Sequence, residues 1–284
     1  MQTQQPTVVV TGASGLLGRA VYKALIATNK YNVVGTKFSR QNDTYVKLDI
    51  TNRAELHTFF DFYRPAAVIH CAAERRPDVA EKNKAAAHLI NVTAAGWTAD
   101  ECHIIGAWFC YISTDYVFDG KNPPYETDSV PNPLNYYGLV PLLYGYVEFD
   151  EESAVNCLVP IVKNSAKKVL MDDFQIRYPT NCDDAASALI RLVSQSISKK
   201  SISGVYHFCG KDKMTKYEMC VVIAGALGIS IEHLEPLRDF PTSALAARPY
   251  NAELSNSRIE DEARIRVSCT PFFVWWTQYL KKIN

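Results

Sequence analysis

The stretch that decides the fold is Thr7-Val-Val-Val-Thr-Gly-Ala-Ser-Gly-Leu-Leu-Gly18. Its valines form a strand-like run, and an apolar helical pattern follows the last glycine. Gly-x-x-Gly-x-x-Gly between a strand and a helix is typical of dinucleotide-binding loops. Gly12 permits the tight turn, Gly15 lets the backbone approach a pyrophosphate, and Gly18 lets the helix pack close to the strand. An ordinary glycine-rich turn is the alternative, but strand, spacing and helix all favour the dinucleotide site.

Strand-like and helical patterns alternate over the first half of the chain. The sequence predicts strands at residues 7–12, 31–38, 45–50, 65–73 and 106–114, with helices at 15–28, 52–63 and 78–104. This alternation predicts an α/β fold, a Rossmann-type doubly wound parallel sheet covered by helices on both faces. We expect the Rossmann domain to span residues 1–145. A smaller mixed lobe, interleaved with it, would span residues 146–284.

The second half has weaker patterns. It predicts helices near residues 181–197 and 215–227 and a strand at Val205-Tyr-His-Phe208. Thr215 and Glu218 have the spacing of a capping box, and Gly228 would end that helix. The last amphipathic segment, residues 272–280, is rich in aromatic residues. It is either the final helix packed on the core or an element that docks a partner.

Composition excludes several classes of protein. Thirty basic residues balance thirty acidic ones, so the net charge favours neither nucleic acid nor an anionic membrane as a partner. The eight cysteines form no C-x-x-C pair, which indicates buried free thiols in a reducing compartment. The histidines have no metal-ligand spacing, so no metal site is expected. The first strand leaves no room for a signal peptide, which predicts a location in the cytosol, or in the cytosol and nucleus.

The end of the second predicted strand selects the cofactor. NAD-binding sites place an acid there for the ribose hydroxyls, but this chain has Lys37-Phe-Ser-Arg40. A guanidinium beside a small hydroxyl suits a 2′-phosphate, so NADP is favoured over NAD. The alternative is that these cations are a solvated strand end. Residues 47–49 would lie along the adenine, and residues 71–75 would border the ribose and phosphates.

Several further motifs carry a family resemblance. Ser113-Thr-Asp-Tyr-Val-Phe-Asp-Gly120, Gln175-Ile-Arg-Tyr-Pro-Thr180 and Arg248-Pro-Tyr-Asn-Ala-Glu-Leu254 resemble extended short-chain dehydrogenases/reductases of the dTDP-4-dehydrorhamnose reductase branch. Residues 70–78, 122–125 and 214–219 narrow the resemblance to the regulatory β subunits of methionine adenosyltransferase. It runs nearly from end to end of the chain.

The resemblance implies a reductase-like fold that binds NADP and modulates the catalytic subunit that makes S-adenosylmethionine. By matching motif it also implies four sets of cofactor contacts. These are Ser14, Gly15, Leu16 and Leu17 in the loop; Phe38, Ser39 and Arg40 at the 2′-phosphate; Lys47, Leu48 and Asp49 at the adenine; and Cys71, Arg75, Tyr137 and Leu143 at the nicotinamide half. For the apolar members, core packing is the alternative role of the side chain.

The chain departs from this pattern after Tyr137. Thr114 and Tyr137 match the catalytic hydroxyl and proton-transfer tyrosine of the resembled reductases, but position 141 is proline where they have lysine. Such a lysine binds the nicotinamide ribose and lowers the pKa of the tyrosine. Without it, Thr114 and Tyr137 are expected to be vestigial and the chain to be a regulator rather than an enzyme.

The departure after Tyr137 involves more than the one lysine. Relatives have a long helix after this tyrosine, but here Tyr137-Gly138 runs directly into Leu139-Val-Pro141. A parallel crossover needs about a dozen residues or more, usually helical. We therefore expect an internal deletion, from an isoform or a faulty gene model, and no homodimer through that helix. The alternatives are an NADPH-dependent sugar-nucleotide reductase and an isoform with a compromised fold.

Overall fold

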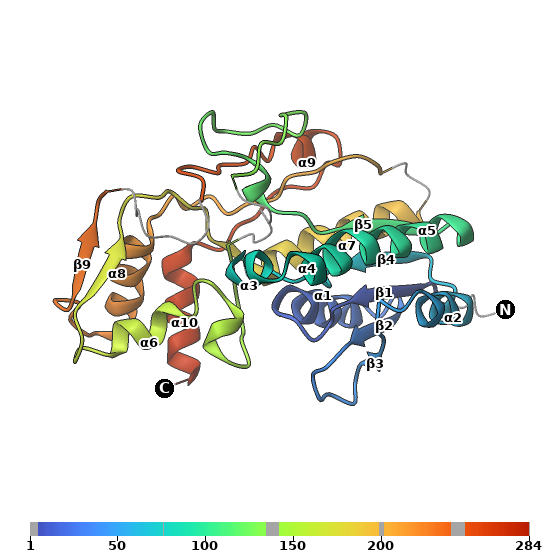
Figure 1. The fold of residues 1–284 in the computed structure, drawn as a ribbon, viewed down its shortest axis with the longest axis horizontal. Helices are drawn as coiled ribbons and strands as arrows, with labels where there is room; N and C mark the ends of the chain where they lie inside the picture. The colour runs from blue at the N-terminus through green and yellow to red at the C-terminus, as the bar shows by residue number, and fades with distance from the viewer. Residues whose placement is uncertain (1–4, 76, 135–141, 199–201, 240–247, 284) are drawn as a thin grey trace. The chain divides into compact units, whose positions relative to one another are not determined.

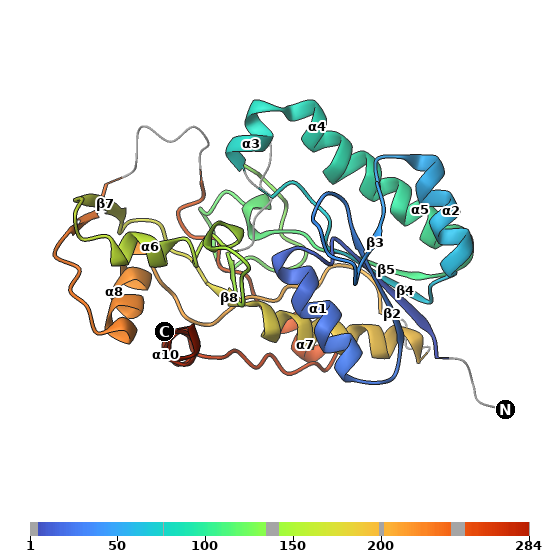
Figure 2. The same cartoon turned by 90° about the horizontal axis from the view of Figure 1, so that it is seen from below.

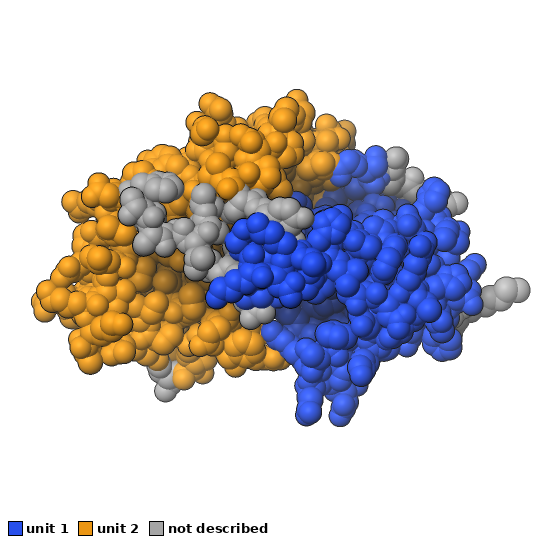
Figure 3. Space-filling model, viewed as in Figure 1, with its two compact units in different colours: residues 1–113, 185–204 blue, residues 114–184, 205–284 orange. Residues whose placement is uncertain are grey.

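The computed structural model describes residues 5–75, 77–134, 142–198, 202–239 and 248–283. The chain forms two compact units, one from residues 1–113 and 185–204 and the other from residues 114–184 and 205–284 (Figure 3). Each unit therefore contains two separate stretches of the sequence. The functional domain boundary expected at residue 145 stays a prediction.

The first unit contains a five-stranded parallel sheet (Figure 1). Its strands are β1 (Thr7–Thr11), β2 (Asn32–Lys37), β3 (Val46–Lys47), β4 (Ala67–His70) and β5 (Trp108–Tyr111), in the order β3-β2-β1-β4-β5. All four neighbouring pairs are parallel. The three valines of β1 are fully buried, as expected for the central strand of a sheet covered on both faces. The predicted Rossmann-type fold is confirmed.

Helices cover both faces of this sheet. Figure 2 shows α1 (Leu16–Ala27) and α7 (Cys182–Ile197) on one side, and α2 (Arg53–Tyr63) and α5 (Ala95–Ile105) on the other. The α2 side chains Leu56 and Phe60 are fully buried in a core that also contains strand residues of β1 and β4. The apolar side chains of the helices predicted from the sequence therefore pack against the sheet, as the fold requires.

The helix predicted over residues 78–104 is interrupted. It consists of α3 (Pro77–Lys82), α4 (Lys84–His88), a π-helical turn (Leu89–Ala94) and α5. Asn83 begins α4 because its side chain accepts a hydrogen bond from the amide of Ala86 (3.1 Å). A second asparagine, Asn91, lies in the π-helical turn. Each break in the predicted helix therefore contains an asparagine, and apolar periodicity alone did not predict these breaks.

The second unit has short strands and a helical core. Strand β6 (Leu143–Tyr144) pairs with β8 (Thr180–Asn181), and β7 (Val169–Asp172) pairs with β9 (Leu234–Leu237). Helices α6 (Leu158–Lys163), α8 (Lys216–Leu227) and α10 (Phe272–Ile283) pack together, and α9 (Ser257–Asp261) is a short turn of helix. The capping box of α8 and its end at Gly228 are confirmed. The strand predicted at residues 205–208 is wrong, because that segment pairs with no strand among the described residues.

The region of the predicted deletion contains no α-helix in the part that is described. Between β5 and β6, residues 112–134 contain the 3-10 turn Asp115–Val117 and an isolated β-bridge from Tyr125 to Leu254. Strand β6 pairs with β8, so β5 is the last strand of the five-stranded sheet. Tyr137 and Pro141 lie outside the described residues. The expectation of an irregular loop therefore holds over its described part.

Within the described ranges, no helix has both the length and the apolar character needed to cross a bilayer. All eight cysteines are buried or half-buried and free. No group of histidine, cysteine and carboxylate side chains among the described residues has the arrangement of a metal site.

Candidate dinucleotide site

The glycine loop is shaped by close backbone contacts. Gly12 has a φ of +64°, and a Cβ added to it would lie 2.8 Å from the backbone of Ala72. A Cβ on Gly18 would lie 2.2 Å from the carbonyl oxygen of Gly12. Helix α1 begins directly after Gly15, which supplies no capping side chain, and no acid occupies the first turn. An uncapped helix start after such a loop fits the phosphates of a dinucleotide.

The end of β2 is joined to this loop. Arg40 donates a hydrogen bond from Nη1 to the carbonyl oxygen of Ser14 (2.6 Å). Phe38 and Ser39 are exposed, and the Phe38 side chain has an exposed fraction of 62%. The three residues expected at the 2′-phosphate therefore lie beside the loop, and core packing does not account for Phe38.

The residues expected at the adenine have mixed surroundings. Lys47 is exposed, whereas Leu48 is buried in the core of the first unit. The Asp49 carboxylate accepts hydrogen bonds from the amide and hydroxyl of Thr51 (2.9 and 2.6 Å) in the turn before α2. The Leu48 side chain thus has a structural role, and contact of Leu48 with adenine would have to come from its backbone. The Asp49 side chain holds the turn through one of its two carboxylate oxygens.

Cys71 and Arg75 follow β4. The Cys71 amide donates to Thr11 at the end of β1 (3.2 Å). Burial raises the pKa of the Cys71 thiol, and the nearby Cys110 raises it further, which disfavours the thiolate form that acts as a nucleophile. Burial also lowers the pKa of His70 to about 4, and this neutral ring is hydrogen-bonded to the Thr11 hydroxyl (3.0 Å).

The sequence reasoning missed Asn91. Its side chain accepts from the Glu74 amide (2.8 Å) and donates to the Glu74 carbonyl (3.0 Å), so it holds the segment that leads into Arg75. Its own carbonyl accepts from the Tyr111 hydroxyl (3.3 Å). The Asn91 residue has an exposed fraction of 4%, and this burial, which only the structure shows, is what marks the amide as structurally engaged.

The remaining predicted residues belong to the second unit or are not described. Thr114 begins the 3-10 turn, where its hydroxyl accepts from the Tyr116 amide (3.2 Å) and donates to the Asp115 carboxylate (3.0 Å). Leu143 is half-buried in β6. Tyr137 lies outside the described residues. The first unit therefore brings together the residues predicted for the loop, the adenine and the 2′-phosphate, together with Cys71 and Arg75.

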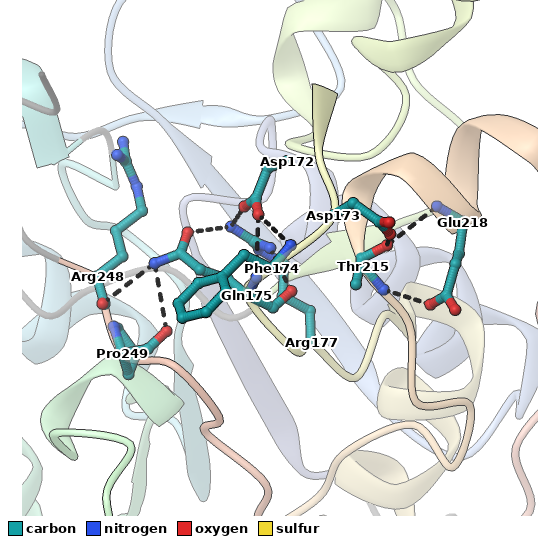
Figure 4. Close-up of polar contacts among 9 residues, drawn as sticks. All are labelled: Asp172, Asp173, Phe174, Gln175, Arg177, Thr215, Glu218, Arg248 and Pro249. Carbon is teal, nitrogen blue, oxygen red and sulfur yellow. Dashed lines mark hydrogen bonds and ion pairs between the residues drawn. The ribbon is translucent and has the colours of Figure 1, made fainter. Parts of the chain in front are cut away.

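A polar network joins three of the motif segments in the second unit (Figure 4). Arg177 forms an ion pair with Asp172 (2.7 Å) and donates to the Gln175 side chain (2.7 Å), which in turn donates to the Arg248 carbonyl (3.2 Å). Asp173 accepts from the hydroxyl of Thr215, the N-cap of α8 (2.9 Å). Segments distant in sequence are thus held together by buried polar groups.

Asp115 predicts a pH dependence of stability. Burial raises its pKa to about 7, against the lowering effects of the Thr114 hydroxyl and Arg177. Since the unfolded-state pKa is about 4, folding favours the protonated carboxyl. The protonated Asp115 carboxyl therefore contributes fully to the free energy of unfolding below pH 4, and this contribution is lost as the pH rises to about 7. Asparagine stays neutral at every pH and does not lose this contribution. The free energy of unfolding of Asp115→Asn should therefore rise relative to that of the wild type by roughly 2 to 4 kcal/mol between pH 4 and 7.5, at about 1.4 kcal/mol per pKa unit.

Urea unfolding of both proteins across this range measures the difference. His70 acts in the opposite direction, because its lowered pKa costs stability as the pH falls. It is present in both proteins and therefore cancels. Parallel pH profiles of the two proteins would contradict the assignment to Asp115.

The parallel sheet, the glycine loop and the uncapped α1 define a Rossmann-type dinucleotide-binding protein. The model of the RmlD substrate binding domain matches the chain in two segments, residues 6–143 and 140–270. The dTDP-4-dehydrorhamnose reductase of Bacillus anthracis, solved in complex with NADP, has a TM-score of 0.82 and 23% identity and covers 98% of this chain and 100% of its own.

Sequence relatives narrow the class further. Methionine adenosyltransferase 2 subunit beta of Xenopus tropicalis is 40% identical over 295 residues, which cover 94% of this chain and 88% of the relative. The dTDP-4-dehydrorhamnose reductase of Aggregatibacter actinomycetemcomitans is 30% identical and covers 97% of both chains. The chain belongs to the methionine adenosyltransferase β-subunit family, within the extended short-chain dehydrogenase/reductase superfamily.

Proposed function

We propose that the chain is a non-catalytic regulatory subunit that binds NADP and assembles with the catalytic subunit of methionine adenosyltransferase. The observation that carries this proposal is the family membership, at 40% identity over 94% of the chain. The fold and dinucleotide loop of a reductase are retained beside it. In this assignment the cofactor stabilises the subunit and is not consumed.

The arrangement at the end of β2 supports NADP. Arg40 lies within hydrogen-bond distance of the loop, and residues 36–40 contain no acid that would bind ribose hydroxyls. A guanidinium pairs well with a phosphate monoester. The Bacillus anthracis relative of the same fold was solved with NADP. NADP supplies hydride chemistry when bound to a reductase, but here the chain's own residues would only bind and orient it.

The absence of turnover rests on the region after Tyr137. Position 141 is proline, so the lysine that would lower the pKa of the tyrosine is missing from its usual place. The two family-model segments meet at residues 140–143, directly after the expected deletion. The alignment with the Xenopus relative spans 295 positions yet covers 94% of a 284-residue chain, so the relative has internal residues that this chain lacks.

Co-purification with a methionine adenosyltransferase catalytic subunit tests the proposal. We expect the two chains to elute together in size-exclusion chromatography, and the rate of S-adenosylmethionine formation to change when this chain is added. We also expect NADP to raise the melting temperature, because a ligand at about 100 times its Kd adds roughly 2.7 kcal/mol to the stability.

Three results would contradict parts of the proposal. Separate elution of the two chains would contradict the proposed assembly with the catalytic subunit. NADPH oxidation with a dTDP-4-keto-6-deoxy sugar, at a rate lost on Tyr137→Phe, would favour the sugar-nucleotide reductase. No thermal shift with either NADP or NADPH would favour an isoform with a compromised fold.

A further inference from the structure

Lys216 begins α8, in an unfavourable place for a positive charge. It is the first residue after the N-cap Thr215, where the helix dipole opposes a cation. Its side chain is half-buried and forms no hydrogen bond or ion pair with another described residue. An ammonium is costly to withdraw from water without a paired charge. The position therefore favours the neutral amine form of this lysine.

Three carboxylates around the start of α8 are engaged with other groups (Figure 4). Asp172 forms an ion pair with Arg177 (2.7 Å). Asp173 accepts a hydrogen bond from the Thr215 hydroxyl (2.9 Å). Glu218 accepts one from the Thr215 amide (2.8 Å) as part of the capping box. These carboxylates thus hold the helix start together and form no ion pair with the lysine that follows the N-cap.

Two thiols lie beside this lysine. Cys220 is four residues further along α8 and therefore on the same face of the helix. Cys157 is the residue before α6, which packs against α8 (Figure 2). Electrostatic interactions join Cys157 to both Lys216 and Cys220. Cys220 is completely buried, whereas Cys157 is half-buried, so the Cys157 thiol is the one that a small molecule can reach from solvent.

The surroundings shift the amine and the thiol in opposite directions. Burial lowers the pKa of Lys216, and the neighbouring Arg177 lowers it further. Arg248 acts in the same direction on this pKa, while Cys157 and Asp172 oppose it. Burial raises the pKa of the Cys157 thiol, and Lys216 opposes this shift. Both shifts favour an amine beside a protonated thiol, and burial next to a cation is a common way of activating a lysine as a nucleophile.

We propose that Lys216 captures small aldehydes as an imine, with the Cys157 thiol as the proton donor. The Nζ lone pair attacks the carbonyl carbon, and a proton passes from this nitrogen to the oxygen to give a carbinolamine. The thiol then gives its proton to the hydroxyl group, which leaves as water while the nitrogen lone pair forms the C=N bond. The iminium nitrogen returns a proton to the thiolate. Amine and aldehyde thus become imine and water, with no oxidant or reductant.

Reductive alkylation of the folded wild type tests the capture of an aldehyde. Acetaldehyde with excess cyanoborohydride near neutral pH converts each imine into an N-ethyl group, and peptide mass spectrometry measures the rate at each lysine. Lys213, exposed in the segment before α8, is the reference within the same protein. We expect Lys216 to react at least about tenfold faster than Lys213, because each unit by which the pKa is lowered raises the amine fraction roughly tenfold.

The same reaction in concentrated urea is the control for the fold. Unfolding exposes both lysines to water, so the two rates should become similar. Lys216 reacting no faster than Lys213 in the folded protein would overturn the inference. A preference for Lys216 that persists in urea would also overturn it, because the preference would then come from the local sequence and not from the cluster.

Cys157→Ala tests the proton donor. We expect it to slow the ethylation of Lys216 by about tenfold or more and to leave that of Lys213 unchanged. Cys157→Ser, which retains a hydroxyl, should lie between the wild type and the alanine variant. A thiol that is only a neighbour would give the opposite result, since its removal would lower the pKa of Lys216 further. An unchanged or faster rate in Cys157→Ala would therefore overturn the role of Cys157, and the comparison of the two lysines in the wild type stands if the variant does not fold.

Discussion

Gly18→Ala is expected to abolish dinucleotide binding and to lower the free energy of unfolding by roughly 2 to 4 kcal/mol. The added methyl group would lie 2.2 Å from the Gly12 carbonyl oxygen and 2.9 Å from the Ala13 Cα. Both neighbours are backbone atoms of the loop, so neither can rotate away. Helix α1 or the loop must move, and either shift changes where the phosphates would bind. Calorimetric titration with NADP and urea unfolding measure the two effects.

Gly96→Ala is the matched control for this substitution. Gly96 lies in α5, and a Cβ added to it meets no atom within 4 Å. Alanine should therefore leave NADP binding unchanged and stabilise the helix by up to about 1 kcal/mol. Normal NADP binding by Gly18→Ala would show that the loop does not hold the nucleotide as proposed.

Trp276→Ala is expected to cost about 3 to 5 kcal/mol of stability. Trp276 in α10 is completely buried, and its ring lies 5.1 Å from Trp275 and 5.5 Å from Tyr279 between ring centroids. Its indole N–H has no partner among the described residues, so the loss would reflect packing alone. Denaturant unfolding, followed by circular dichroism, measures the change.

Phe273→Ala provides the control on the same helix. Phe273 has an exposed fraction of 57%, so its replacement should change the stability by no more than about 0.5 kcal/mol. A similar loss for both variants would contradict the assignment of α10 to the core. Because α10 packs against α8, removing residues 270–284 would disrupt the second unit as well as any interface. Substitution of Phe273 is the cleaner test of whether this helix docks a partner.

Local signals gave the most accurate predictions. The boundaries of α1 lie within one residue of those expected, because a strand, a glycine turn and an apolar helix follow each other without interruption. The start of α8 was equally clear, since Thr215 and Glu218 satisfy each other's amides within a single turn. The strand expected at residues 205–208 was wrong for the opposite reason. Alternating apolar residues can be extended, but a strand also needs a neighbour that its own sequence does not specify.

The candidate site divides in the same way. The glycines and the cations at the end of β2 were visible in the sequence, because their roles depend on backbone geometry and charge. Asn91 was not, since it acts on a segment 17 residues away, at Glu74. Its partner is known only once the segment after β4 has been placed beside the helical run that contains Asn91.

The sequence alone determined the class of protein, because the strand, loop and first helix form within 21 consecutive residues from Thr7 to Ala27. It also showed the departure at Pro141 and the resemblance to β subunits of methionine adenosyltransferase. Only the tertiary structure decided that the aromatic residues of α10 form a core and that Arg40 is hydrogen-bonded to Ser14 in the glycine loop. Burial and long-range hydrogen bonds depend on which elements meet, and that is settled by packing rather than by the pattern of any one segment.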